Sequence, residues 1–248
     1  MTMKGVVLAG GTGSRLTPLT KVTNKHLLPV YDKPMIYHSL ECLAKSGIQD
    51  VLLVTGGNSA GDFLKLLKDG KELGLKSLYY AYQEGAGGIA QALLLAEDFA
   101  DGTPIVLMLG DNIVERTIQD AIGGFRRQGK GARILLYPVE NPELYGIAEV
   151  ENSRIVRIVE KPKNSTSNLA VVGIYMYDHT VFDIVKTLKP SARRELEITD
   201  VNNAYLARGE LAFTMLEGWW VDAGENIDYY LSSCQRVAQC GANHCAPR

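Results

Sequence analysis

Short apolar runs alternate with segments of helical period along the first half of the chain. The apolar runs predict buried strands at Gly5–Ala9, Val51–Val54, Leu78–Ala81 and Ile105–Leu109. The helix-period segments predict helices at Pro34–Lys45, Phe63–Leu67 and Ile89–Asp98. This alternation of strand and helix is typical of a mostly parallel sheet with helices on both of its faces.

The second half of the chain is richer in strands. Strand-like runs occur at Arg133–Tyr137, Ile147–Val150, Ile155–Val159, Val171–Tyr177, Phe213–Leu216 and Trp219–Val221. Helical patterns occur at Val181–Leu188, Ile198–Arg208 and Ile227–Val237. We therefore expect an α/β fold of the Rossmann-like class, built on one mixed, mainly parallel sheet. Ligands of such sheets bind beyond the carboxyl ends of the strands, so residues that follow strands matter most.

Composition narrows the class of protein. The 248 residues are 46% hydrophobic and 22% charged, as in ordinary globular proteins, and the net charge is -2. A nucleic-acid-binding protein usually carries a basic excess, so we expect no nucleic-acid partner. No apolar run is long enough to cross a bilayer, and the first one is too short for a signal peptide. We expect a cytoplasmic protein without a membrane partner.

Three of the four cysteines crowd the C-terminus. Cys234, Cys240 and Cys245 lie near His244, whereas Cys42 falls within a helical pattern. The spacings match none of the usual zinc patterns. The sequence favours a frayed tail with free thiols, and a zinc site stays open as the alternative.

The first strand runs into a glycine-rich loop that contains Gly10, Gly11, Thr12, Gly13, Ser14 and Arg15. Glycines let backbone amides approach a ligand closely, and concave groups of amides bind phosphate. Arg15 and, further on, Lys25 add positive charge for phosphate oxygens. The loop lacks the Gly-Lys-Ser/Thr of a Walker A loop, and Leu16 occupies the third glycine position of the dinucleotide fingerprint. This disfavours an NAD-dependent oxidoreductase. A plain tight turn remains the alternative to a phosphate loop.

Two aspartates directly follow apolar strands. Asp111 comes after the Ile105–Leu109 run, and Asp222 comes after Trp219–Val221. A carboxylate at the end of a strand is a good ligand for a hard cation such as Mg²⁺. Aspartate is also common in turns and helix caps, so both alternatives stay open from the residues alone.

Three stretches, Leu8–Leu16, Asn24–Val30 and Lys33–Ile36, resemble the signature of the sugar nucleotidyltransferases, and they are most similar to the glucose-1-phosphate thymidylyltransferases within that family. The resemblance extends to about Tyr230. It implies that loop 10–15 and Lys25 bind the nucleotide triphosphate, with Arg15 and Lys25 as the catalytic cations. It also implies that Asp111 contacts the nucleotide and that Asp111 and Asp222 hold Mg²⁺.

The same resemblance assigns the remaining ligand contacts. Gln83 and Gly88 match positions that read a pyrimidine, which suits an amide that both donates and accepts hydrogen bonds. The positions that match the sugar-phosphate pocket are Tyr145, Gly146, Glu160, Lys161, Val171, Arg193 and Trp220. From the residues alone, the spacing of Glu160 and Lys161 favours a solvated charge pair, and for Trp220 a ligand contact and a core position stay equally open.

The resemblance implies Mg²⁺-dependent transfer of a thymidylyl group from dTTP to α-D-glucose 1-phosphate, which gives dTDP-glucose and pyrophosphate. It implies one domain over 1–248, with a nucleotide-binding half at 1–112, a sugar-binding half at 113–230 and a helix end and tail at 231–248. It also implies a homo-oligomer, a dimer or a tetramer. A uridylyltransferase or another nucleotidyltransferase of the same fold is one alternative, and a non-catalytic sensor of nucleotide sugars is another.

Three features depart from the family pattern. His26 stands where many members carry Gln, and Arg194 stands where Gly is common. The chain also stops soon after its last helix, so we expect a short form without the helical extension that helps to form a regulatory site in longer members.

Overall fold

The computed structural model describes residues 2–85 and 87–245, and the chain divides into two compact units. Unit 1 comprises Met1–Met3, Gly87–Leu107 and Asp120–Leu216. Unit 2 comprises Lys4–Ala86, Met108–Gln119 and Glu217–Arg248. Each unit is assembled from separate stretches of sequence, and the predicted halves at 1–112 and 113–230 stay a prediction.

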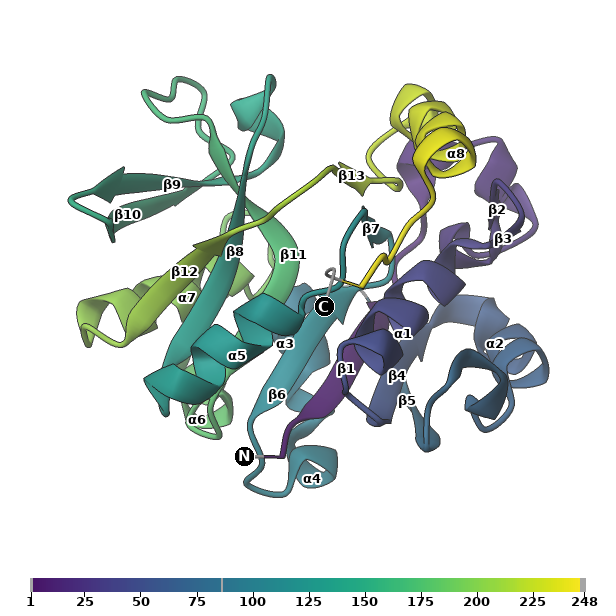
Figure 1. Ribbon diagram of the computed structural model, residues 1–248, viewed down its shortest axis with the longest axis horizontal. Coiled ribbons are helices and arrows are strands. Elements are labelled where there is room, and N and C mark those ends of the chain that lie inside the picture. Colours follow the sequence, from purple (N-terminus) through teal and green to yellow (C-terminus); the bar gives the residue numbers. More distant parts are fainter. Residues whose placement is uncertain (1, 86, 246–248) are drawn as a thin grey trace. The chain divides into compact units, whose positions relative to one another are not determined.

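Unit 2 is built on parallel strands β1 (Lys4–Ala9), β4 (Asp50–Gly56) and β5 (Ser77–Gln83), in that order (Figure 1). Every residue of β1 and β4 after the first is buried, which is typical of parallel strands covered on both faces. The end of β6 (Ile105–Leu109) lies beside β1, since the Gly110 amide donates to the Leu8 carbonyl at 2.9 Å.

Helix α1 (Met35–Lys45) buries Ile36, Leu40 and Leu43 completely. It begins after Pro34, and Gly47, at φ 84°, ends it in the left-handed conformation. The other elements of unit 2 are α2 (Ala60–Leu67), the strand pair β2 (Pro29–Val30) and β3 (Lys33–Pro34), the strand pair β7 (Asn112–Val114) and β13 (Trp220–Asp222), and α8 (Ile227–Cys240). Short 3₁₀ turns cover Ser14–Leu16, Leu19–Lys21, Lys25–Leu27, Gly57–Ser59 and Lys71–Leu73.

The expected frayed tail is wrong as far as Cys245. The Asn243 amide donates to the Val114 carbonyl at 3.0 Å, and the His244 amide donates to the Glu115 carbonyl at 2.7 Å. The Asn243 side chain donates to the carbonyl of His38 at 2.8 Å. These bonds dock the segment after α8 alongside β7, because they satisfy backbone groups that a frayed end would leave to water. All four cysteines are free thiols.

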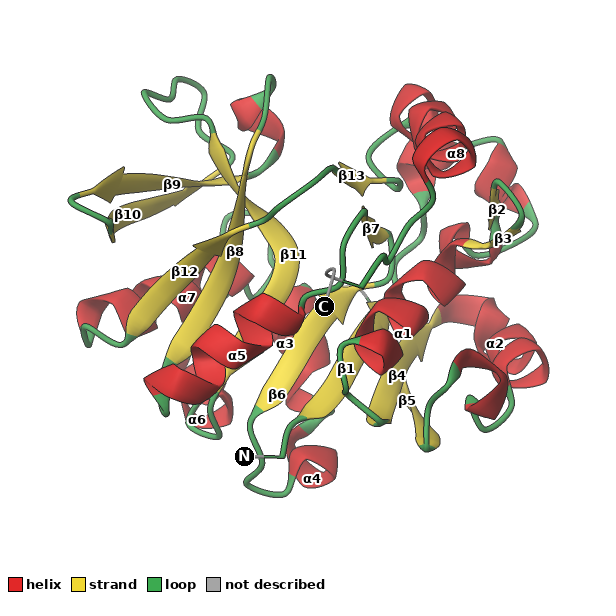
Figure 2. Cartoon of the chain, viewed as in Figure 1, coloured by secondary structure: helices red, strands yellow, loops and turns green. Residues whose placement is uncertain are grey.

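Unit 1 contains a mixed sheet in which β10 (Arg154–Glu160), β9 (Gly146–Glu151), β11 (Leu169–Tyr177) and β8 (Ala132–Pro138) are antiparallel neighbours, and β12 (Leu211–Met215) is parallel to β8 (Figure 2). Its helices are α3 (Ile89–Leu94), α4 (Glu97–Ala100), α5 (Gln119–Gln128), α6 (Val181–Thr187) and α7 (Ile198–Ala207), and Pro142–Leu144 forms a 3₁₀ turn. The rings of Tyr177 and Tyr205 stack with centroids 5.7 Å apart in its interior.

The Rossmann-like class with a mixed, mainly parallel sheet is confirmed. The single helix predicted at Ile89–Asp98 is wrong, because α3 and α4 are separate. The Ala96 amide bonds to the Leu93 carbonyl three residues back, at 2.9 Å, which breaks the α-helical ladder. Among the described residues, no helix is long and apolar enough to cross a membrane.

Candidate active site

The glycine-rich loop leaves β1 at its carboxyl end, in unit 2. Gly13 has φ 61°, and a Cβ there would lie 2.9 Å from Thr20 Cγ2 and 3.2 Å from Lys25 Cβ. The Thr20 hydroxyl donates to the Gly13 carbonyl at 2.8 Å. Both the backbone conformation and the close packing therefore require glycine, and the loop brings Arg15 and Lys25 into one neighbourhood.

Lys25 and Asp111 form an ion pair, with Lys25 Nζ donating to Asp111 Oδ2. Asp111 directly follows β6, as its position after an apolar strand predicts, and Asn24 caps the turn that carries Lys25. The side chains of Lys25 and Asp111 are only 12% and 8% exposed. Little water screens this pair, so its charges interact strongly.

Asp222 is brought to Asp111 by the β7–β13 pair. Asp222 faces Asn112 in the register, and the Ala223 amide donates to the Asp111 carbonyl at 2.9 Å. Burial raises the pKa of Asp222 and the charge of Asp111 raises it further, to about 7. Burial also opposes ionisation of Asp111, but the charge of Lys25, together with the hydrogen bonds from Lys25 and Asn112, holds the pKa of Asp111 well below its usual range. The two carboxylates therefore repel each other, and a cation would relieve that repulsion.

Gly224 leaves room for this group of charges. A Cβ at position 224 would lie 2.5 Å from Asp111 Oδ2 and 2.6 Å from Lys25 Nζ, so a larger residue would displace these two groups. Two carboxylates are a donor set that suits Mg²⁺, which usually takes its remaining ligands from substrate phosphates and water. The described residues contain no group of three or more His, Cys, Asp or Glu that could hold a metal. The pair fits a metal that binds together with a nucleotide.

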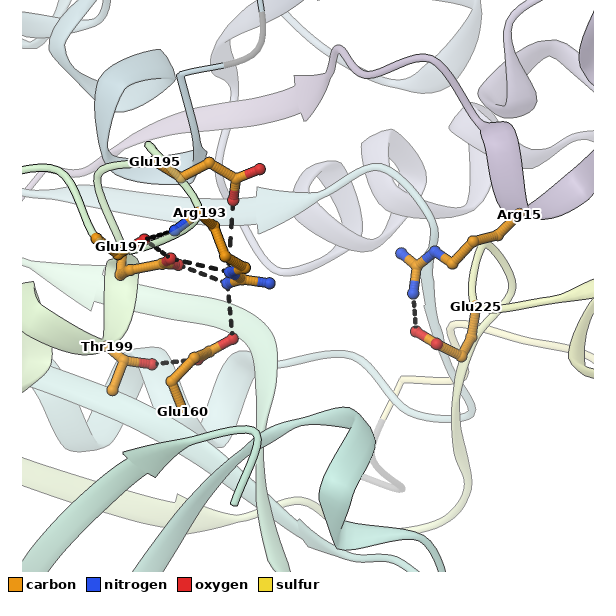
Figure 3. Close-up of polar contacts among 8 residues, drawn as sticks. Arg15, Glu160, Arg193, Glu195, Glu197, Thr199 and Glu225 are labelled. Carbon is orange, nitrogen blue, oxygen red and sulfur yellow. Dashed lines mark hydrogen bonds and ion pairs between the residues drawn. The ribbon is translucent and has the colours of Figure 1, made fainter. Parts of the chain in front are cut away.

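Arg15 pairs with Glu225, a residue that no sequence signal indicates (Figure 3). Arg15 Nη1 donates to Glu225 Oε2 across 210 positions of sequence. Partial burial lowers the pKa of the Arg15 guanidinium, but the hydrogen bond and charge of Glu225 outweigh this and raise it. The loop cation is therefore anchored to the segment that precedes α8.

Trp220 lies in unit 2, behind Asp111. Its indole Nε1 donates to Asn112 Oδ1 at 2.7 Å, and Asn112 Nδ2 donates to Asp111 Oδ1 at 3.0 Å. Trp220 is only 6% exposed. The structure thus places Trp220 with the carboxylate pair, whereas the other predicted sugar-phosphate residues lie in unit 1.

Gln83 ends β5 and is buried, and a Cβ built on Gly10 would lie 3.1 Å from Gln83 Oε1. The structure therefore brings Gln83 to the glycine-rich loop. Gly88, the other predicted pyrimidine contact, lies in unit 1 at φ 94°, where it precedes α3.

In unit 1 the predicted sugar residues gather where β9 begins and β10 ends. Glu160 faces Gly146 in the register, and a Cβ on Gly146 would lie 3.3 Å from Glu160 Oε2. The Lys161 amide donates to the Tyr145 carbonyl at 3.0 Å, and Val171 follows the two β11 residues that pair with β9. Glu160 accepts from the Thr199 hydroxyl at 2.6 Å.

Arg193 is surrounded by carboxylates in unit 1 (Figure 3). Its Nη2 lies 3.1 Å from Glu160 Oε1, 2.7 Å from Glu197 Oε2 and 3.9 Å from Glu195 Oε2. Its Nε also donates to Glu197, at 3.1 Å. The hydrogen bonds that Arg193 donates to Glu197 raise the pKa of Arg193. Burial raises the pKa of Glu197, but its bonds from Arg193 and Ser191 outweigh this and lower it.

Comparison with known proteins decides the family. The model of the family described as nucleotidyl transferase matches residues 4–238. The chain belongs to the nucleotidyl transferase family. Members of this family generally use a divalent metal.

Two curated relatives are named glucose-1-phosphate thymidylyltransferase. The one from Actinoplanes sp. is 44% identical over 238 residues, which cover 95% of this chain and 77% of that protein. The one from Neisseria meningitidis is 44% identical over 250 residues, which cover 98% of this chain and 86% of that protein.

Two crystal structures are also similar. A Bacillus anthracis protein in complex with sucrose, described as a candidate glucose-1-phosphate thymidylyltransferase, is 49% identical with a TM-score of 0.91, over 97% of this chain and 96% of that chain. A UDP-glucose pyrophosphorylase with bound UDP-glucose has a TM-score of 0.84 at 24% identity, over 96% and 99% of the two chains, which shows a shared fold.

His26, which stands where many nucleotidyl transferases carry Gln, is a packing residue in this structure. It is 2% exposed, its Nδ1 lies 2.8 Å from Asn24 Oδ1, and a Cβ on Gly110 would lie 2.8 Å from its Cδ2. Asn24 Nδ2 donates to the Ala9 carbonyl, so the Oδ1 atom accepts and His26 Nδ1 carries the proton. Burial and the charge of Lys25 lower the pKa of His26 to about 3.

Arg194 has φ 62°, which is the left-handed region that glycine adopts without strain. This conformation explains why glycine suits the position in the nucleotidyl transferase pattern. Its amide donates to the Ser191 carbonyl at 2.8 Å, closing the turn that presents Arg193.

Proposed function

We propose that this nucleotidyl transferase moves a thymidylyl group from dTTP to α-D-glucose 1-phosphate and releases pyrophosphate. The observation that carries the proposal is the group formed by Arg15, Lys25, Asp111 and Asp222 in unit 2, where both cations interact electrostatically with both carboxylates. The names of relatives that are 44% identical over nearly the whole chain support this choice of substrates.

The residues of unit 2 would act on the triphosphate. Arg15 and Lys25 would balance the charge that develops on the α-phosphate and on the departing pyrophosphate, and the glycine-rich loop would supply amides. Asp111 and Asp222 would hold Mg²⁺, which would offset the charge of the phosphates when bound. Gln83, from the end of β5, would present its amide to the base. Gly88, in unit 1, is the second position that the family resemblance assigns to the base.

The residues of unit 1 would hold the acceptor. Glu160 would accept hydrogen bonds from sugar hydroxyls, and Lys161 and Arg193 would align the phosphate whose oxygen attacks the α-phosphorus. Tyr145, Gly146 and Val171 would shape this pocket of unit 1. Trp220, which the family resemblance also assigns to the sugar phosphate, belongs to unit 2. The attacking phosphate is already ionised near neutral pH, so the reaction needs positioning and charge balance more than a general base.

We further propose a cytoplasmic homo-oligomer, on the strength of the family resemblance. The activity is tested by measuring pyrophosphate release with Mg²⁺ across dTTP, UTP, CTP, ATP and GTP, each with glucose 1-phosphate and with other sugar 1-phosphates. Release mainly with dTTP and glucose 1-phosphate is the expected result. Release with another pair would reassign the substrates, and nucleotide binding without any release would favour a sensor.

A further inference from the structure

Glu225 occupies a buried position beside the proposed triphosphate loop. Its side chain is 8% exposed, and its amide lies 3.3 Å from the Asp222 carbonyl. The next residue, Asn226, caps α8 by accepting from the Tyr229 amide at 2.9 Å. The backbone at Glu225 is thus held on both sides, between the carboxylate pair and a helix of 14 residues.

Arg15 uses only part of its guanidinium in this contact. Nη1 donates to Glu225, whereas within residues 2–85 and 87–245 neither Nε nor Nη2 has a protein partner. The Arg15 side chain is 48% exposed, so that edge remains accessible. The Nε and Nη2 donors are parallel and match the spacing of two phosphate oxygens.

We propose that Glu225 is a positioning residue for Arg15: it fixes one end of the guanidinium so that the opposite edge meets the triphosphate. The inference rests on the proposed function, in which Arg15 binds that group. A long side chain that is already held loses less freedom on binding its ligand, which strengthens binding. A carboxylate that only blocked Arg15 would compete for the same two donors, but Glu225 engages the other end of the group.

The pairing with Arg15 also offsets the negative charge that Glu225 adds to the site. Unit 2 places three carboxylates, Asp111, Asp222 and Glu225, beside two cations. An unpaired buried carboxylate at position 225 would repel a triphosphate, and Arg15 offsets that charge. Each residue of the pair therefore makes the other compatible with the ligand.

The test is a double-mutant cycle with Glu225→Ala, Arg15→Ala and the double variant, using Mg²⁺-dTTP as the probe. We expect Glu225→Ala to weaken dTTP binding and to lower kcat/KM for dTTP about 10-fold, with the KM for glucose 1-phosphate unchanged. The double variant should lie within about 2-fold of Arg15→Ala, because Glu225 acts only through Arg15. Glu225→Gln, which keeps an acceptor oxygen, should recover part of the loss.

Glu41→Gln is the matched control, because Glu41 forms a 2.6 Å ion pair with Lys33 in the same unit and is 19% exposed. This variant should leave kcat/KM for dTTP and the KM for glucose 1-phosphate unchanged. Additive losses in the cycle, or tighter dTTP binding by Glu225→Ala, would overturn the proposal. If no pyrophosphate is released, the proposed transfer fails, and the same cycle is measured as the affinity for dTTP by calorimetry. Coupled losses of affinity in that cycle would still support the positioning role of Glu225. A wild-type protein that binds no dTTP would overturn both.

Discussion

Both units bring an arginine together with carboxylates, but they balance the charges differently. In unit 2, Arg15 and Lys25 each have one carboxylate partner, and glycines at positions 13 and 224 leave space beside them. In unit 1, three glutamates share the single guanidinium of Arg193. The one-to-one ion pairs of unit 2, with Asp222 as a third carboxylate beside them, suit exchange for phosphate and metal. The three glutamates around one guanidinium in unit 1 suit the hydroxyl groups of a sugar.

Among the substitutions considered, removing the charge of Asp111 should lower the activity most. We expect Asp111→Asn to lower kcat by about 10²–10³ or more, because loss of one such electrostatic contact commonly has that effect. Asp62→Asn, at an exposed position on α2, is the control and should retain activity. Initial rates of pyrophosphate release give the result, with thermal unfolding to confirm folding. Near-normal turnover by Asp111→Asn would remove Asp111 from the mechanism.

The space beside the pairs is tested by Gly224→Ala. The added Cβ would force Asp111 and Lys25 apart, and we expect kcat to fall about 10²-fold, as for a displacement of about 1 Å at a reacting centre. Gly61→Ala is matched to it, since a Cβ at position 61 meets nothing within 4 Å. Equal rates for the two variants would show that the pair tolerates displacement.

Arg193→Ala tests whether unit 1 holds the sugar phosphate. We expect the KM for glucose 1-phosphate to rise about 10-fold, a modest effect because the side chain is 45% exposed and partly screened by water. The KM for dTTP should stay the same. Arg208→Ala, an exposed arginine of unit 1, serves as the control. A change confined to the KM for dTTP would contradict this division of roles.

The units also differ in their buried histidines. His26 and His38 of unit 2 are buried, whereas His179 of unit 1 is exposed. Burial and the charge of Lys33 lower the pKa of His38 to about 4. The unfolded chain takes up this proton below about pH 6.5, so the free energy of unfolding falls as the pH drops from about 6.5 towards 4.

From pH 7 to pH 5, protonation of His38 in the unfolded chain should lower the free energy of unfolding by about 2 kcal/mol. Urea unfolding at both pH values measures it, and His38→Gln should lose correspondingly less stability on acidification. Parallel losses in the wild type and the variant would exclude His38 as the source.

Most of the fold and the backbone positions of the site are predictable from the sequence. Buried strands correspond directly to apolar runs, so the sequence alone places Asp111 and Asp222 at strand ends. Helix α5 escapes such a prediction because Gly123 and Gly124 interrupt its pattern, yet a Cβ on Gly124 would lie 3.2 Å from the Arg133 guanidinium. Tertiary packing there outweighs the low helix propensity of glycine.

The partners of the site residues are not predictable in the same way. Arg15 and Glu225 are 210 positions apart, and no local pattern links them. Glu197 resembles any surface glutamate until the turn at 191–197 places it on Arg193. The docked tail also escapes prediction, because its hydrogen bonds go to backbone carbonyls of distant segments that sequence does not reveal.

Metal removal tests most directly whether the transfer depends on a metal held at Asp111 and Asp222. Pyrophosphate release from dTTP and glucose 1-phosphate is measured after treatment with a chelator and again after Mg²⁺ is restored. We expect release to stop without the metal and to return with Mg²⁺. Release that continues unchanged in the chelator would contradict it.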